Sequence, residues 1–131
     1  MLTRRTVLSV AATLAALSLT SATHAADSKP FDQKAFEAAQ AAGKPILVEV
    51  YAPWCPTCRA QAPILTKLGG SAKFKDVVRF KVDFDGQKDV LKTFKVNVQS
   101  TLIAFKGKKE VGRSSGDTNA ASIEALFAKA I

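Results

Sequence analysis

Apolar residues along the chain follow the period of strands in some segments and the period of helices in others. Residues 46–51 form an almost continuous apolar run with several β-branched side chains, which is typical of a strand covered on both faces. Residues 77–84 alternate between apolar and polar side chains and indicate a second strand. Residues 101–105 are again apolar, and residues 110–113 follow them after a tight, lysine-rich turn. The pattern therefore predicts four strands.

Four segments with helical spacing surround these strands. The predicted helices cover residues 32–42, 55–68, 87–94 and 119–130. Asp32 is placed to cap the first helix, Gly43 to end it, and Pro63 to kink the second helix. Because helices alternate with the first three strands and a hairpin follows, the order predicts parallel strands and an antiparallel edge. The expected architecture is an α/β fold with a central mixed four-stranded sheet flanked by helices.

The amino-terminal segment differs in composition from the rest of the chain. Arg4 and Arg5 precede the apolar residues 6–19, a run shorter than the ~20 residues that span a bilayer as a helix. Small side chains follow this run, as at the cleavage site of an exported protein. We therefore predict a secretory signal peptide over residues 1–25, followed by a single domain over residues 26–131.

Export would place the protein in the periplasm, where disulfides form and persist. Cleavage after Ala26 and an uncleaved membrane anchor remain as alternatives. The paired arginines also resemble the twin-arginine export signal. Such pairs are common in ordinary signal peptides, so we favour the general secretory (Sec) route.

Composition excludes several classes of chemistry. The chain has 19 lysines and arginines against 11 acidic residues, a formal net charge of +8, two cysteines and one histidine. The histidine is His24, so removal of the predicted signal peptide would exclude histidine-based catalysis and histidine metal ligation. Two cysteines are too few for a disulfide scaffold or for a zinc site built from protein ligands alone. No nucleic-acid motif accompanies the basic residues, which we interpret as a solvated surface, with steering of acidic partners as the alternative.

The chemistry is expected at Cys55 and Cys58, which flank Pro56 and Thr57 at the junction of a strand and a helix. Side chains three residues apart on a helix are neighbours, so the two sulfurs can reach disulfide geometry. Unpaired N–H groups and the helix dipole favour a thiolate on the first cysteine. Cys55 is then the attacking sulfur and Cys58 the resolving one. A static disulfide and a soft-metal site are the alternatives.

Residues 48–58 (VEVYAPWCPTC), together with Pro63, resemble the active-site segment of the thioredoxin family. The likeness covers residues 31–131 and extends to the order of helices and strands. It implies the thioredoxin fold and a thiol–disulfide oxidoreductase, with Cys55 as the nucleophile and Cys58 as the resolving thiol. No cofactor is expected beyond this dithiol.

The resemblance also suggests which residues contact the substrate. Trp54 matches the family's tryptophan beside the nucleophile, which shields the sulfur and forms part of the partner surface. Pro56 resembles the proline at the same position in glutaredoxins and in periplasmic disulfide oxidases. The predicted substrate-binding residues are Trp54, Pro56, Thr57, Ser100 and Thr101.

Glu49 is an acid within the apolar run of residues 46–51. Burial of an acid is costly unless it is paired or neutral. The resemblance implies that Glu49 corresponds to the family's buried aspartate and accepts the proton of Cys58 during resolution. Lys81 matches the family's lysine that faces this acid. Exposure of Glu49 on a solvated strand face is the alternative.

Ser100 departs from the family pattern, because it stands where relatives carry a cis-proline opposite the dithiol. A cis bond before a residue other than proline costs roughly 2.5–4 kcal/mol, so we predict a trans Gln99–Ser100 bond. The loop is then expected to present its backbone differently to a partner. Metal capture by the dithiol also becomes possible, because the family's proline helps to exclude metals.

These observations favour an enzyme that reduces or isomerises disulfides in exported proteins with cysteines. The absence of the long helical insertion of dedicated periplasmic oxidases argues against an oxidase. A membrane electron donor, a monomeric state and no binding to nucleic acid are expected. The alternative is a thioredoxin-fold metal carrier or chaperone that uses the dithiol as a ligand pair.

Overall fold

The computed structural model describes residues 27–131, so the predicted signal peptide over residues 1–25 lies outside the described residues. The elements are β1 (Lys29–Pro30), α1 (Gln33–Ala41), β2 (Pro45–Tyr51), α2 (Pro56–Gly69), β3 (Val78–Asp83), α3 (Lys88–Phe94), β4 (Thr101–Lys106), β5 (Lys109–Ser115) and α4 (Ala120–Ala130). Every predicted helix and strand is therefore present. No helix within residues 27–131 is long and apolar enough to cross a membrane.

The sheet has five strands in the order β1-β3-β2-β4-β5. β1 and β2 pair with β3 in parallel, whereas β4 is antiparallel to β2 and β5. The predicted mixed sheet is confirmed, but the expected number of four strands is wrong. The additional strand β1 contains only Lys29 and Pro30, both exposed, so it leaves no apolar pattern in the sequence. Pro30 lacks an N–H group and is tolerated because β1 is an edge strand.

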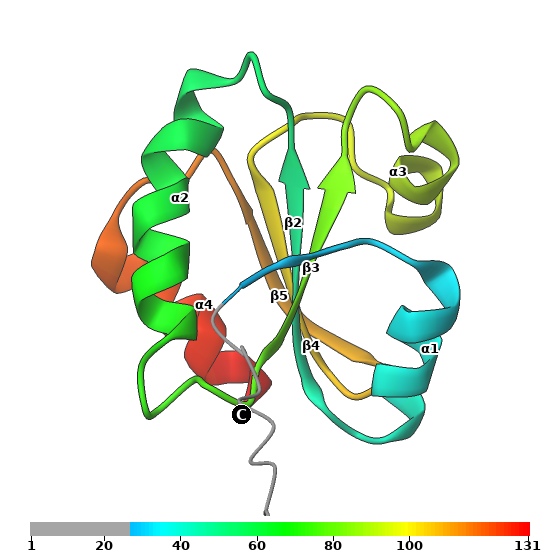
Figure 1. Ribbon diagram of the computed structural model, residues 1–131, viewed down its shortest axis with the longest axis vertical. Helices are drawn as coiled ribbons and strands as arrows, with labels where there is room; N and C mark the ends of the chain where they lie inside the picture. Colours follow the sequence, from blue (N-terminus) through cyan, green and yellow to red (C-terminus); the bar gives the residue numbers. More distant parts are fainter. Residues whose placement is uncertain (1–26) are drawn as a thin grey trace, which may run out of the picture.

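Helices cover both faces of the sheet, as Figure 1 shows, with α1 and α3 on one face and α2 and α4 on the other. The face of α1 and α3 is packed with phenylalanine, including Phe36, Phe80 and Phe94. Aliphatic side chains of β2 and β4, such as Leu47 and Leu102, face α2 and α4. Alternation along β2 sends consecutive side chains to opposite faces, so Leu47 and Glu49 share the face of α2.

Local sequence sets the ends of the helices. Asp32 accepts a hydrogen bond from the N–H of Ala35 at 2.8 Å and caps α1, as predicted. Gly43 follows α1 with a φ of +69°, a conformation that glycine adopts without strain. Pro63 lies inside α2, and the helix runs through it to Gly69. The N-cap and first turn of α2, which contain the two cysteines, lie directly after the end of the central strand β2.

Candidate active site

Cys55 and Cys58 form a disulfide at the start of α2, directly after the loop that leaves β2. Their Cα atoms are 5.3 Å apart. Cys55 is the N-cap of the helix, and its Sγ accepts the N–H of Cys58 at 3.0 Å. Pro56 fits the first helical position because its missing N–H would have no partner there. The sulfur of Cys55 thus occupies the place where helix N–H groups stabilise negative charge.

Both cysteines are buried in this oxidised state: Cys55 is completely buried and Cys58 is 4% exposed. They form a small cluster with Ala52, against which Tyr51 and Phe84 pack. A nucleophile cannot reach a sulfur that has no exposed surface. Attack on Cys55 therefore requires a local movement of its cover.

Trp54 lies beside the dithiol and is 53% exposed. Its indole N–H donates to Oδ2 of Asp85 at 2.8 Å, and its ring contacts Phe84 edge-on, with centroids 6.2 Å apart. The side chain is held in one orientation while much of its surface faces solvent. This placement suits the predicted partner-contacting role of Trp54. Asp85, which fixes the ring, was not singled out by the sequence.

Glu49 is buried, 4% exposed, and its Oε1 accepts a hydrogen bond from Nε of Arg79 at 2.6 Å. The alternative of a solvent-exposed Glu49 is therefore wrong. Lys81 is the register partner of Glu49 on β3, but its ammonium lies 4.7 Å above the ring of Tyr51. Arg79, two residues earlier on the same face of β3, is the ion-pair partner of the acid. Its planar guanidinium directs an N–H at the carboxylate, as a lysine cannot do in the same fixed geometry.

A cavity of about 290 Å³ lies beside the dithiol, between α2 and the strands β2 and β3. Its charged and polar lining includes Cys58, Glu49, Gln61, Arg79 and Lys81. Water needs only about 10–15 Å³ and two to four polar partners, so this space can hold it. The cavity gives Cys58 and Glu49 a common, polar environment.

Ser100 has a trans peptide bond, as predicted, because residues 27–131 contain no cis bond. Its φ is +59°, and its N–H donates to the carbonyl oxygen of Val50 at 2.9 Å. Cys58 Sγ lies 3.9 Å from the same oxygen. Proline could neither adopt this φ nor donate this hydrogen bond. Serine in place of the family's proline therefore gives the loop a hydrogen bond to β2 that a proline at this position cannot make.

Gln61 connects α2 to this loop. It is buried, and its Nε2 donates to the carbonyl oxygens of Ser100 at 3.2 Å and Asp117 at 2.8 Å. Gln61 was not singled out by the sequence. The available signal was its position one helical turn after Cys58, which places it on the same face of α2.

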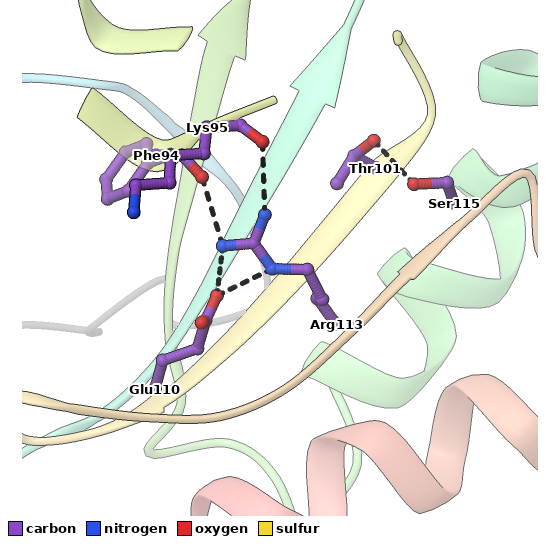
Figure 2. A network of polar contacts seen from close by, with 6 residues as sticks. All are labelled: Phe94, Lys95, Thr101, Glu110, Arg113 and Ser115. Carbon is purple, nitrogen blue, oxygen red and sulfur yellow. Dashed lines mark hydrogen bonds and ion pairs between the residues drawn. The ribbon is translucent and has the colours of Figure 1, made fainter. Parts of the chain in front are cut away.

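Polar contacts also hold the segment that precedes Ser100 (Figure 2). Arg113 on β5 donates to the carbonyl oxygens of Phe94 at 3.0 Å and Lys95 at 3.5 Å, and it pairs with Glu110. These carbonyls end α3, where Lys95 adopts a φ of +55°. A cation at a helix C-terminus is favourable because the dipole there is negative. Arg113 thus fixes the start of the loop that carries Ser100.

Thr101 is buried, and its hydroxyl donates to the carbonyl oxygen of Val98 at 2.8 Å. It also lies 2.9 Å from the hydroxyl of Ser115 (Figure 2). The single proton of the Thr101 hydroxyl is thus already engaged with Val98. Pro56 is exposed and Thr57 is half-buried beside the disulfide, and their contact with substrates stays a prediction. In the described part of the chain, no group of three or more His, Cys, Asp or Glu could hold a metal ion.

Known proteins are similar to this chain in sequence and in fold. The profile of the family Thioredoxin matches residues 27–129. Thioredoxin H-type from Brassica campestris is 39% identical over 80 residues, which are 61% of this chain and 63% of that protein. Thioredoxin-1 from Saccharomyces cerevisiae is 35% identical over 95 residues, which are 72% of this chain and 90% of that protein. The crystal structure of Trxlp from Edwardsiella tarda EIB202 matches with a TM-score of 0.75 and 42% identity, over 77% of this chain and 98% of that chain.

A cysteine pair at the N-terminus of a helix, next to the central strand of a mixed sheet, defines a thiol–disulfide oxidoreductase. The chain belongs to the thioredoxin family. The predicted fold and class of enzyme are both confirmed.

Proposed function

We propose that this protein reduces or isomerises disulfides in exported proteins, with Cys55 as the nucleophile and Cys58 as the resolving thiol. The observation that carries the proposal is the position of Cys55 as the N-cap of α2. In the oxidised structure the N–H of Cys58 lies 3.0 Å from the sulfur of Cys55. In the reduced protein the same N–H would stabilise the Cys55 thiolate. Cys58 follows one turn later, within reach of any disulfide formed on Cys55.

The reaction has two exchange steps. The Cys55 thiolate attacks one sulfur of the partner's disulfide, forming a mixed disulfide, while the other partner sulfur leaves and takes a proton from solvent. Cys58 then gives its proton to Glu49 and attacks Cys55 Sγ. The mixed disulfide breaks, the Cys55–Cys58 disulfide forms, and the second partner sulfur leaves as a thiolate. Two electrons have passed from the dithiol to the partner.

The partner is proposed to lie against Trp54 and the loop that ends at Ser100. Trp54 and Val98 are large apolar side chains that remain exposed in the described residues. Val98 belongs to the segment that Thr101 and Arg113 hold in place. Exposed apolar surface beside a reactive pair suits an unfolded or extended polypeptide. Lys81 remains a candidate catalytic residue because it lines the cavity that contains Cys58.

Localisation in the periplasm forms part of the proposal. It is supported by the arginines and the short apolar run within residues 1–25. Such a reductant needs electrons, which we assign to a membrane donor. Expression of the full chain in a bacterium, cell fractionation and mass analysis of its N-terminus test this part. A chain retained in the cytoplasm with residues 1–25 intact would contradict it.

Insulin reduction by the purified protein in the presence of dithiothreitol tests the enzyme directly. The wild type should accelerate precipitation of the insulin B chain, and Cys55→Ser should remain at the rate of dithiothreitol alone. A measured reduction potential then distinguishes a reductant from an oxidant. Wild-type protein that gives no acceleration but binds Cu(I) or zinc tightly would instead favour the carrier alternative.

A further inference from the structure

Arg79 is a buried cation on the face of β3 that α2 covers, with 4% of its surface exposed. A buried charge is costly unless other groups compensate it. Arg79 donates from Nε to Oε1 of Glu49 at 2.6 Å, and the two side chains are almost equally buried. The pair therefore places a negative carboxylate and a permanently charged guanidinium inside the domain.

This ion pair lies in the wall of the cavity that also contains Cys58. Glu49 reaches the cavity from β2, Arg79 from β3 and Cys58 from α2. The three side chains therefore line one cavity that is large enough for water, although they are far apart in the sequence. A water molecule in this space could carry a proton from Cys58 to Glu49.

We propose that Arg79 is the positioning residue for proton transfer in this site, orienting the Glu49 carboxylate at the wall of the cavity beside Cys58. This inference rests on the proposed function, in which Glu49 accepts the proton of Cys58. When the proton moves, the Cys58 S–H bond breaks and a Glu49 O–H bond forms. Arg79 exchanges no proton, because its guanidinium stays charged throughout.

Lys81 does not perform this task in the structure, although it is the register partner of Glu49. Its ammonium lies over the ring of Tyr51 at 4.7 Å, and the residue as a whole is partly exposed. Lys81 and Arg79 occupy the same face of β3 and line the same cavity. Replacement of Lys81 would therefore remove a cation from the cavity wall but leave the ion pair of Arg79 and Glu49 intact.

Any pH dependence must take account of all the titratable groups around the cavity. Besides Glu49, Arg79 and Cys58, the described lining contains Asp27 before β1, Tyr51 on β2 and Lys81 on β3. Gln61 and Thr66, the other polar lining residues from α2, do not titrate. Glu49 receives the guanidinium hydrogen bond, so the loss of Arg79 removes a cation in direct contact with this carboxylate.

The test is the pH dependence of the resolution step in the full chain. Reduced protein is mixed with a peptide disulfide, and formation of the Cys55–Cys58 disulfide is followed through Trp54, the only tryptophan. We expect Arg79→Met to slow resolution at pH 7 by about 10-fold or more, and to move the acid limb of the profile to higher pH. Arg79→Lys should recover part of the rate, and Lys73→Met, at an exposed cation outside the cavity, should stay within about twofold of the wild type. An unchanged acid limb in Arg79→Met would overturn the inference.

The double variant Glu49→Gln/Arg79→Met covers the case in which Arg79→Met alone fails to fold, because it removes both charges together. Its resolution profile should match that of Glu49→Gln alone, and a further loss of rate would contradict a role exerted through Glu49.

Insulin reduction distinguishes failure of this inference from failure of the proposed function. If Glu49→Gln leaves the profile unchanged while the protein still reduces insulin, the roles of Glu49 and Arg79 both fail and the oxidoreductase proposal stands. If the wild type does not reduce insulin, the proposed function itself fails.

Discussion

The backbone N–H of Ser100 donates to the carbonyl oxygen of Val50 at 2.9 Å, and this bond ties the loop before β4 to the end of β2. The same oxygen lies 3.9 Å from Cys58 Sγ. Ser100 is therefore part of the immediate environment of the resolving cysteine, through a backbone group rather than through its side chain. Restoring the family's proline at this position would remove that group.

Ser100→Pro should destabilise the protein by about 3 kcal/mol or more, since proline cannot adopt a φ of +59° and has no N–H to donate. Ser100→Gly is the matched control, because glycine accepts this φ and keeps the N–H. It should change the free energy of unfolding by less than about 1 kcal/mol. Urea denaturation of the oxidised proteins measures both. Equal stability of the proline and glycine variants would show that the loop adapts to a different backbone.

Gln61→Ala should cost about 1–3 kcal/mol of unfolding free energy, because the partly buried carbonyl of Asp117 loses its donor and the buried carbonyl of Ser100 loses one of its two donors. Gln33→Ala on α1 is the control. Gln33 is exposed and donates to the equally exposed Glu37, so this variant should stay within about 0.5 kcal/mol of the wild type. If both glutamine variants have the same stability, the bridge from α2 to the loop contributes nothing.

Asp85→Ala should free the indole of Trp54, whose N–H now donates to this carboxylate. We expect a change in tryptophan fluorescence and a several-fold lower rate of insulin reduction, because the partner surface loses its fixed orientation. Asp89→Ala, on the exposed side of α3, is the control, since Asp89 pairs only weakly with Lys92. Wild-type fluorescence and rate in Asp85→Ala would exclude an orienting role.

Arg113→Ala should loosen the end of α3 and the loop that follows, because the carbonyls of Phe94 and Lys95 lose a charged donor. Amide hydrogen exchange over residues 94–100 should accelerate, while exchange in β2 should not change. Unchanged protection of residues 94–100 would indicate that packing alone holds this segment.

The sequence predicted the elements that have a strong pattern and missed those that have none. The strand of residues 46–51 and the helix that starts after Cys55 were predictable from apolar runs and from helix-start chemistry. β1 was not, because it has two exposed residues and exists only through its pairing with β3. The cysteine pair was recognisable because both cysteines lie in one local motif.

Partners that come from distant segments were beyond the sequence. Glu49 could be singled out as an acid in an apolar strand, but the resemblance pointed to Lys81 as the facing cation. Arg79 and Lys81 are two residues apart on β3 and therefore lie on the same face of the sheet. Which of the two pairs with Glu49 depends on the direction of each side chain, and the sequence does not show that direction. Gln61 and Asp85 likewise gain their roles only when α2 and the loop after β3 are folded against the site.

The most direct test of the central claim is to trap the mixed disulfide with Cys58→Ser. Attack by Cys55 would still form the bond to a peptide disulfide, but without Cys58 the bond could not be resolved. Mass analysis under non-reducing conditions should show one peptide attached at Cys55, released by dithiothreitol, and no adduct in Cys55→Ser. An adduct on Cys58 in the Cys55→Ser variant, with none on Cys55 in Cys58→Ser, would contradict the assigned order of the two sulfurs.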